Sequence, residues 1–490
     1  MKRYICAGAI GAAMAVSTVS AQELTFRFEA SDQSFTPVHS YAVGTLGDQR
    51  LMFGGITGFG LHQISQPKGP APIFAPKSVY NQQIIMADES DGSVRTASLA
   101  HLSAAVQDAL LVTNVSGYQS GNTLYLYGGY GPNMDETDVV TKPLVTSVNL
   151  SMIASAMELG LAVPEAAFNV QTSEAARTTG AEIFPLDSGR FVLYGGANFI
   201  GDYPSHTLLD YKEAAHVFDL SVSSTVPETT VVSENEFLTT DLQRRDLNGQ
   251  TMTYMEGGEK VYGFMVTGGV FKYGSLHYDT PVSWKDGDTY CVEDTGSLIK
   301  LNLYHSPTAS FYSDASDRNR IVIFGGITAY DSVDAEFANF SLPWSDMLSE
   351  CEFDGPTLVE ERQIGNTPMP ITNAHLVVRD VIPHDVNKQV MLDELPPNEI
   401  LLGSIYGGVR AVAPGNEPAT YASGEVTDVY VVKGVRGDLT GNGVTDGSDL
   451  AVLLAGWGAG YKTADLNWDG IVNGSDLAVL LSMWGRDFPG

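Results

Sequence analysis

Six short apolar runs that each end in a glycine pair constrain the fold of this chain more than any other feature. The second glycines of the pairs stand at 55, 129, 196, 269, 326 and 408, which gives spacings of 74, 67, 73, 57 and 82 residues. One local pattern that returns at such intervals is typical of a repeat fold. Each run is rich in aromatic and β-branched residues and predicts a short strand that stops where glycine permits a sharp bend. The runs are LMFGG (51–55), LYLYGG (124–129), FVLYGG (191–196), FMVTGG (264–269), IVIFGG (321–326) and SIYGG (404–408).

The surroundings of these runs predict three or four antiparallel strands in each repeat. Arg50, Arg190 and Arg320 directly precede three of the runs and follow turn-like segments, so a hairpin is expected to enter the Gly-Gly strand. Predicted partner strands upstream are 39–45, 178–186, 307–313 and 374–381, and further strands downstream are 145–151, 215–221, 298–304 and 428–434. Six such units predict an all-β protein with the layout of a six-bladed β-propeller.

A strand with a glycine pair followed by an aromatic-bearing strand resembles the kelch repeat. The resemblance extends over about residues 24–434 and implies a kelch-type β-propeller domain, with bounds of 22–434. The last repeat is short, and an unpaired edge strand would be a liability. We therefore expect ELTFRFEA (23–30) to complete the last blade.

The first 21 residues have the pattern of a signal peptide. Lys2 and Arg3 precede an apolar run that ends in small residues, with a cleavage site expected before Gln22. The alternative, a membrane anchor, would need a longer and more apolar run. We expect a secreted, extracellular protein that is attached to a cell surface or free, with no transmembrane segment in the mature chain.

Charge and cysteine content restrict the partners and the cross-links. The chain has 58 acidic against 27 basic residues, a net charge of −31, which disfavours nucleic acid and anionic membranes as partners. Cys291 and Cys351 are the two cysteines outside the signal peptide, and they would either pair or stay buried and reduced.

The repeat region shows no recognisable catalytic motif. Its nine histidines are scattered singly, without metal-ligand spacing, and each is interpreted as a packed or surface residue. The copper oxidases among kelch propellers use a cysteine-linked tyrosine with histidine ligands, and this sequence offers no such ligand spacing. A GxSxG elbow is absent too, and no carboxylate pair can be chosen among 58 acidic residues. The insertion 278–297 is expected to be a loop over one propeller face, where a glycan or protein ligand would bind.

The C-terminal segment contains the same 12-residue pattern twice. In both copies, oxygen-bearing side chains occupy positions 1, 3, 5, 9 and 12, glycine occupies position 6, and the carbonyl of position 7 is available, as in a loop that wraps Ca²⁺. Leucines and a tryptophan follow at helical spacing, so each unit is expected to be a loop and a helix. The predicted ligands are Asp438, Thr440, Asn442, Val444 (carbonyl), Asp446 and Asp449, and then Asp465, Asn467, Asp469, Ile471 (carbonyl), Asn473 and Asp476.

Two loop-helix units in tandem resemble a type I dockerin domain, with bounds of 435–490. The resemblance implies two Ca²⁺ ions as cofactors and a cohesin-like or cell-surface protein as partner. Thr440 is a poorer ligand than Asn or Asp, so the first loop is expected to bind Ca²⁺ more weakly.

The sequence favours a secreted binding or interaction module, held through its calcium-dependent tail. The alternative is an extracellular carbohydrate-active enzyme, a glycoside hydrolase in polysaccharide catabolism, tethered by the same tail. A structural surface protein is a third interpretation. The propeller ligand and any catalytic residues stay open at this point.

Overall fold

The computed structural model describes residues 24–57, 59–61, 77–187, 189–201, 208–212, 215–220, 230–233, 243–272, 276–288, 291–336, 339, 343–396, 399–416, 418–433, 437–440, 444–458, 464, 466 and 471–485. The signal peptide predicted for residues 1–21 lies outside these ranges. The chain divides into two compact units, Phe26–Val432 and a second unit of Met1–Thr25 with Lys433–Gly490. The larger unit is built mainly of strands, which confirms the all-β expectation.

Six of the seven sheets of four or more strands make up most of the larger unit within the described ranges. The first contains β2 (Ala42–Leu46), β3 (Gln49–Phe53), β4 (Gln83–Asp88) and β5 (Val94–Ser98); the second contains β6 (Ser116–Ser120), β7 (Thr123–Tyr127), β10 (Leu144–Asn149) and β11 (Phe168–Thr172). The third contains β12 (Glu182–Asp187), β13 (Arg190–Tyr194), β16 (His216–Asp219) and β17 (Thr230–Ser233); the fourth contains β18 (Gly249–Glu256), β19 (Glu259–Val266), β22 (Val282–Lys285) and β23 (Val292–Glu293). The fifth contains β24 (Thr308–Ser313), β25 (Arg318–Ile327), β26 (Trp344–Asp354) and β27 (Thr357–Asn366), with β30 (Val390–Met391) added to β24 in parallel; the sixth contains β29 (His375–Val378), β31 (Ile400–Tyr406), β34 (Glu425–Lys433) and β1 (Leu24–Ser34).

Shorter elements connect these sheets. Two helices, α1 (Ala104–Leu110) and α2 (Leu150–Glu158), flank the first two sheets. Three small sheets contain β8 (Tyr130–Pro132), β9 (Val139–Thr141), β14 (Ala197–Ile200) and β15 (Leu208–Tyr211); β20 (Val270–Lys272) and β21 (Leu276–His277); and β28 (Ile371–Thr372), β32 (Val409–Ala411) and β33 (Thr420–Ala422).

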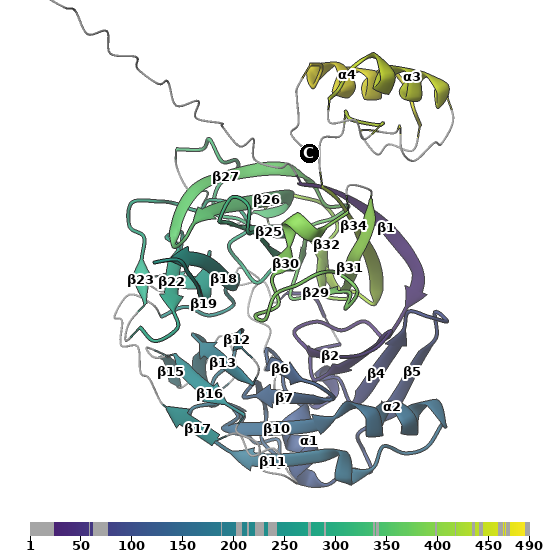
Figure 1. Ribbon diagram of the computed structural model, residues 1–490. Coiled ribbons are helices and arrows are strands. Elements are labelled where there is room, and N and C mark those ends of the chain that lie inside the picture. Colours follow the sequence, from purple (N-terminus) through teal and green to yellow (C-terminus); the bar gives the residue numbers. More distant parts are fainter. Residues whose placement is uncertain are drawn as a thin grey trace, which may run out of the picture. The chain divides into compact units, whose positions relative to one another are not determined.

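The six sheets follow one another around the larger unit in sequence order, from purple through teal to green (Figure 1). Strand β1, from the N-terminal end of the described chain, lies beside β34 at the edge of the sixth sheet. The expectation that the N-terminal strand completes the last repeat is therefore confirmed.

The hairpins predicted to enter the Gly-Gly strands are present. Strands β2 and β3, β12 and β13, and β24 and β25 pair antiparallel. The strand predicted at 298–304 is wrong. Ile299 and Leu303 are buried, but the Glu361 carboxylate accepts the backbone N–H groups of Lys300 and Leu301 at 2.8 Å, so a side chain replaces a neighbouring strand.

The prediction of a surface loop over 278–297 is wrong in its central part. Residues of this segment form β22 and β23, the outer strands of the fourth sheet. Trp284 of β22 is fully buried and its indole N–H donates to the carbonyl of Asp288 at 3.0 Å. Trp284 of this segment thus belongs to the core and not to a ligand site on the surface.

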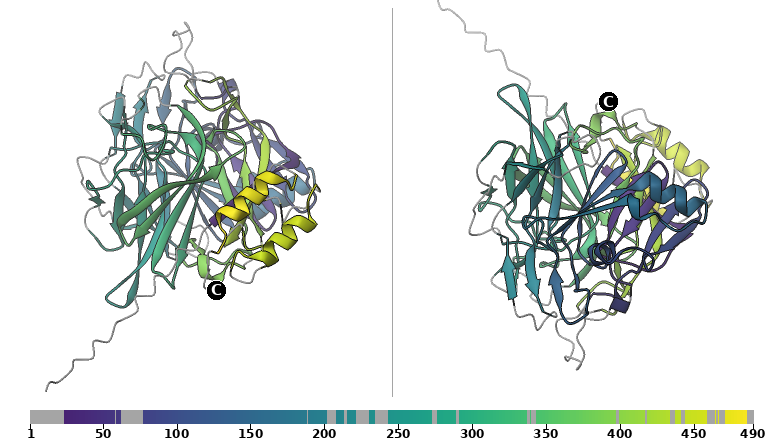
Figure 2. Two further views of the ribbon diagram at one scale, coloured as in Figure 1. Left: turned by 90° about the horizontal axis from the view of Figure 1, so that it is seen from above. Right: turned by 90° about the horizontal axis from the view of Figure 1, so that it is seen from below.

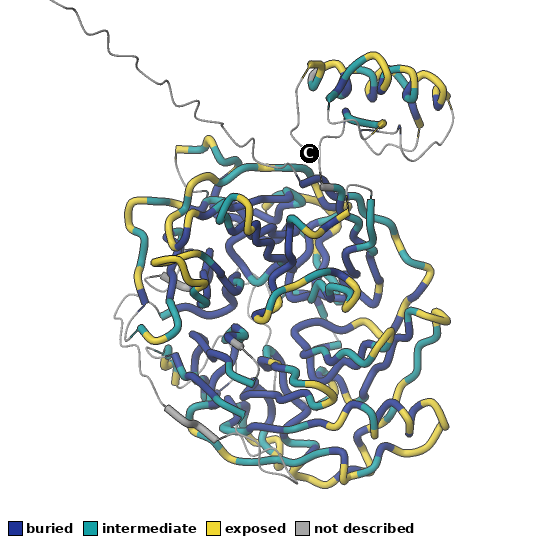
Figure 3. Tube along the Cα trace, in the orientation of Figure 1, coloured by how far each residue is buried: buried dark blue, intermediate teal, exposed yellow. Residues whose placement is uncertain are grey.

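Alternation along the central strands serves two cores at once. In β3, Leu51 and Phe53 pack toward the second sheet while Met52 packs toward the sixth. Strand β13 behaves in the same way, since Val192 and Tyr194 join the cluster shared with the fourth sheet. Because both faces of each strand are covered, the runs are apolar throughout instead of alternating with polar residues. The buried residues follow these strands, and the exposed ones gather at turns and outer edges (Figure 3).

A closed circle of six backbone hydrogen bonds links all six repeats. One residue of each repeat, just before the first strand of its sheet, donates its N–H to the carbonyl of the corresponding residue in the preceding repeat, and the N–H of Ser40 donates to Asn373, which closes the circle. The six N···O distances lie between 2.8 and 3.2 Å. The members of this hydrogen-bond ring are Ser40, Asn114, Gly180, Asp246, His305 and Asn373.

The glycine pairs lie where neighbouring repeats approach each other most closely. Gly128 has φ +65°, and a Cβ there would stand 2.1 Å from the carbonyl oxygen of Thr178 in the next repeat. Its neighbour Gly129 donates its N–H to that same carbonyl at 2.9 Å. Only glycine meets both the conformation and the contact.

Cys291 and Cys351 are both free and buried. They belong to two separate hydrophobic clusters, which decides between the two alternatives left open by the sequence. Burial raises the pKa of the Cys291 thiol to about 12 and also raises the pKa of Cys351.

The smaller unit contains two helices, α3 (Gly447–Ala455) and α4 (Gly474–Ser482), which contact each other. Figure 2 shows them in yellow-green and yellow. Leu453 and Leu480, at matching places in the two copies, are fully buried in the core of this unit. Trp457 and Trp484 are exposed, so the apolar helix face inferred from sequence is only partly buried.

Candidate functional sites

A central cavity of about 120 Å³ lies next to the hydrogen-bond ring. The first strands of three sheets, β2, β6 and β12, supply most of its wall, and two histidines from later repeats complete it. The lining residues are Ser40, Tyr41, Ala42, Val43, Asn114, Val115, Ser116, Gly117, Gly180, Ala181, Glu182, Ile183, His305 and His375.

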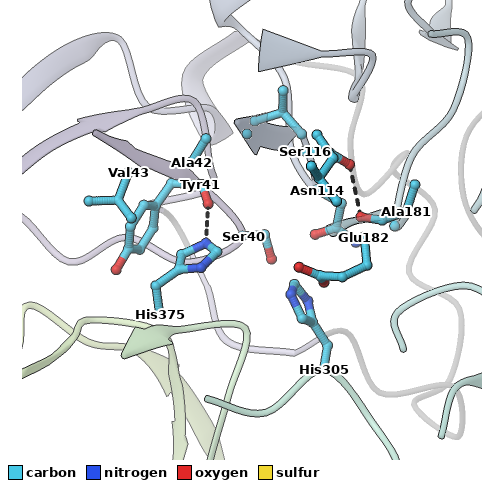
Figure 4. A pocket seen from close by; sticks show the side chains of 14 residues that line it. Ser40, Tyr41, Ala42, Val43, Asn114, Ser116, Ala181, Glu182, His305 and His375 are labelled. Atoms are coloured by element: carbon cyan, nitrogen blue, oxygen red, sulfur yellow. Dashed lines mark hydrogen bonds between the residues drawn. The ribbon is translucent and has the colours of Figure 1, made fainter. Parts of the chain in front are cut away.

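Glu182 is the one carboxylic acid among the described residues that line this cavity. It begins β12, two residues after the ring member Gly180, and its side chain points into the cavity (Figure 4). Burial raises the pKa of Glu182 to about 8, and a hydrogen bond with the backbone of Ile183 offsets only part of this effect. Within the described part of the chain, no Lys or Arg forms an ion pair with it.

His305 faces Glu182 across the cavity (Figure 4). The amide Nδ2 of Asn373 lies 3.4 Å from Nδ1 of His305. Because an amide nitrogen can only donate, Nδ1 accepts and the ring proton sits on Nε2. Burial lowers the pKa of His305 to about 4, so the ring is neutral near pH 7.

His375 is held in the same tautomer as His305. Its Nε2 donates to the carbonyl oxygen of Tyr41 at 2.6 Å, which leaves Nδ1 as an acceptor. Burial, with a smaller effect of His305, lowers the pKa of His375 to about 4. The cavity therefore holds two neutral imidazoles of defined tautomer.

The ring itself holds a second carboxyl group, that of Asp246, which is not among the residues that line the cavity. Asn114 donates its side-chain N–H to Asp246 Oδ1 at 2.8 Å, and Asp246 is buried. Burial raises the pKa of Asp246, while the guanidinium of Arg245 at 3.7 Å acts in the other direction. Asp246 thus has partners, whereas Glu182 is left to the cavity.

This site could not be found by considering each histidine alone. The structure places His305 and His375 in the cavity wall, whereas their isolated positions in the sequence predicted a packed or surface role for each. The signal is their register, because His305 is a ring member and His375 follows the ring member Asn373 by two residues, as Glu182 follows Gly180. Aligning the repeats on the ring would have brought these residues together.

The first predicted calcium loop gathers oxygen atoms around Asp449. This carboxylate is fully buried; Oδ1 accepts from the backbone N and Oγ1 of Thr440, both at 2.9 Å, and Oδ2 accepts from the N–H of Asp446 at 2.8 Å. Thr440 Oγ1 also lies 3.5 Å from Asp438 Oδ1. Positions 1, 3 and 12 thus lie together, and Asp446 caps α3 through the N–H of Ser448.

The second loop repeats this arrangement in its described part. Asp476 is fully buried and accepts from the backbone N–H groups of Leu466 and Asn473, both at 2.7 Å. The side chain of Asn473 donates to the carbonyl of Ile471 at 3.0 Å. Four predicted ligands, Asn442, Asp465, Asn467 and Asp469, lie outside the described residues.

The donor set fits a hard cation. Carboxylate, hydroxyl and carbonyl oxygens are the ligands that Ca²⁺ prefers, and buried carboxylates at position 12 of both loops supply the charge. Across the residues that the structure describes, no group of three His, Cys, Asp or Glu residues is close enough to hold a metal ion by itself.

No family model matches the chain, and no curated protein matches its sequence. Among solved structures, one titled "Structure of YjhT" is similar with a TM-score of 0.44 and 10% sequence identity, over 79% of this chain and 95% of that chain. None of the helices in the described residues has the length and apolar character needed to cross a membrane.

Proposed function

We propose that the larger unit is a six-bladed kelch-type β-propeller that acts as a binding module. The hydrogen-bond ring supports six blades, because each repeat contributes one member and the circle closes between Asn373 and Ser40. The pairing of β1 with β34 supports closure by the two ends of the unit.

The ligand of this module binds in the central cavity. The observation that carries this proposal is Glu182, a carboxyl group inside a cavity, without an ion-pair partner among the described residues, and with a pKa near 8. Carboxyl groups with strongly shifted pKa values that line cavities are concentrated at functional sites, because such groups lower stability and are retained where function needs them.

A ligand screen by thermal shift tests this proposal. Compounds that raise the melting temperature of the full chain should lose their effect in Val43→Phe, which narrows the cavity, and in Glu182→Gln. Glu336→Gln, an exposed glutamate, is the matched control. Stabilisation that is equal in all four proteins would place the ligand elsewhere and contradict the proposal.

Catalysis is the second candidate, and one observation favours it. A carboxyl group with a pKa of about 8 that faces an imidazole has the equipment of a general acid or base. Glycoside hydrolases pair two carboxyl groups across the scissile bond, so Glu182 would need Asp246 as its partner. Turnover of a polysaccharide that is abolished in both Glu182→Gln and Asp246→Asn would establish the enzyme and replace the binding-only proposal.

The smaller unit is proposed to be a dockerin-like tail that binds two Ca²⁺ ions and attaches the protein to a cohesin-like or cell-surface partner outside the cell. The buried Asp449 and Asp476 support it, because bound Ca²⁺ would offset the negative charge of two fully buried carboxylates and stabilise a unit with a small core. Calorimetry of the full chain should show two calcium sites, with one lost in Asp449→Asn and one in Asp476→Asn. Absence of heat in the wild-type protein would refute the calcium proposal.

A further inference from the structure

The central cavity holds an acidic group and lacks a cation to neutralise it. Its described lining contains no Lys or Arg, and both of its histidines are neutral near pH 7. Arg245, the residue before the ring member Asp246, pairs with that aspartate and lies over the ring of Phe199 at 4.6 Å. Glu182 thus has no counter-charge of its own.

A buried carboxylate is costly unless a cation accompanies it. In the empty cavity the cost is avoided by protonation of Glu182. A cationic ligand would remove the need for that proton, and the His305 ring lies near the carboxylate (Figure 4). An anionic ligand would meet the Glu182 carboxylate, with no Lys or Arg among the described lining residues to compensate the charge.

The remaining walls define the shape of the ligand. The acceptor Nδ1 of His375 is available to a second N–H of the ligand, since Nε2 is engaged by Tyr41. Val43, Val115 and Ile183 provide apolar contact beside these polar groups. A cavity of about 120 Å³ is somewhat smaller than an apolar cavity of about 150 Å³ that takes up benzene, so a small organic ligand of several heavy atoms fits within it.

We propose that the central cavity binds a small organic ammonium ion, with the ammonium group paired to the Glu182 carboxylate and a short aliphatic chain against Val43, Val115 and Ile183. This inference rests on the proposed function, because it names the ligand class of the same cavity. A primary ammonium supplies three N–H donors, which match the carboxylate oxygens and His375 Nδ1.

Binding is coupled to proton release. The neutral carboxyl of Glu182 gives its proton to solvent as the ammonium ion enters, and the ligand keeps all of its own protons. As the pH rises toward about 7.5, the affinity for the ammonium ion therefore increases about tenfold per pH unit. It levels off above about pH 8. The titratable groups near Glu182 are His305, His375, Tyr41 and Asp246; burial lowers the pKa of both histidines to about 4 and raises the pKa of Tyr41 and of Asp246.

The test uses n-propylammonium chloride and the full chain, with n-propanol and sodium propionate as neutral and anionic probes of the same size. Calorimetry should show binding of n-propylammonium only, with about one proton released per ligand near pH 6.5. Glu182→Gln, which keeps the shape of the side chain, should weaken binding at least 100-fold and abolish proton release. Glu336→Gln should bind as the wild-type protein does, and a melting curve verifies that each variant is folded.

The possible results separate this inference from the function on which it rests. Binding of n-propanol or propionate that disappears in Val43→Phe would keep the cavity as a ligand site and refute the ammonium class. Equal binding of n-propylammonium to the wild-type protein and Glu182→Gln would refute the inference as well. No binding of any of the three probes overturns the ammonium proposal, and a thermal-shift screen without a cavity-dependent ligand would then overturn the binding function.

Discussion

Replacing Glu182 with glutamine should stabilise the protein at alkaline pH and leave it almost unchanged at acid pH. The folded chain holds the pKa of Glu182 near 8, against 4.5 for a solvated glutamate. Between these two values the folded state binds more protons than the unfolded state, so this group lowers stability as the pH rises from 4.5 to 8. Glutamine has no proton to lose, and the variant escapes this decline.

The magnitude follows from the distance between the two pKa values. Each pH unit corresponds to about 1.4 kcal/mol, so the ionised carboxylate costs at most about 5 kcal/mol near pH 9. Water inside the cavity screens the charge and reduces this to roughly 2–5 kcal/mol. For a unit of about 400 residues, the entropy of unfolding converts that range into a rise of about 2–6 °C in melting temperature.

Thermal melts of wild-type protein and Glu182→Gln between pH 5 and pH 9 provide the measurement. Fluorescence of the fully buried Trp284 follows the larger unit. The difference in melting temperature should grow through the window and become constant above pH 8, while Glu336→Gln should follow the wild-type protein throughout. A constant difference between Glu182→Gln and the wild-type protein from pH 5 to pH 9 would refute the reasoning, because Glu182 would then be ionised like an exposed glutamate.

Three further predictions test the repeat contacts, the tail and the cysteines. Gly128→Ala combines φ +65° with a Cβ 2.1 Å from a backbone oxygen, so it should lower the free energy of unfolding by more than about 3 kcal/mol. Gly47→Ala, at φ +59° with no atom within 4 Å of the added Cβ, should lower it by about 1 kcal/mol. Equal losses for the two variants in denaturant titrations would contradict the clash at Gly128. Thr440→Asn should tighten calcium binding at the first loop toward that of the second, and calorimetry that shows no gain would disprove the ligand ranking. Cys351 is fully buried with its thiol pKa raised, so a thiol reagent at pH 8 should react with it only after unfolding; rapid reaction of the native protein would show that it is accessible.

Local patterns in the sequence carried most of the repeat fold. The Gly-Gly strands, their hairpins and the closing N-terminal strand depend on alternation and turn residues that lie close together in the chain. The segment 298–304 shows where such patterns fail, since its apolar alternation fills a core while Glu361, some 60 residues away, takes its backbone donors. No pattern within 298–304 reveals that a distant side chain takes the place of a neighbouring strand as hydrogen-bond acceptor.

The cavity was out of reach for a different reason. The residues that line it come from five repeats. The difference in residue number between a ring member and the first glycine of its pair varies from 14, for Ser40 and Gly54, to 34, for Asn373 and Gly407. Insertions of this size hide the common register. In the tail, by contrast, the two copies align without gaps, and the helix starts at Gly447 and Gly474 follow the predicted loops directly.

The pairing of β1 with β34 also sets the order in which the larger unit can fold. The two strands are separated by about 400 residues, and bringing them together costs about 5 kcal/mol in chain entropy by the logarithmic loop-closure relation. During synthesis at 5–20 residues per second, β1 waits roughly 20–80 s for its partner. Throughout that time β1 presents an open edge to other molecules. The seam of the sixth sheet is therefore the last step of folding and the step at which crowding by identical chains would lower the yield.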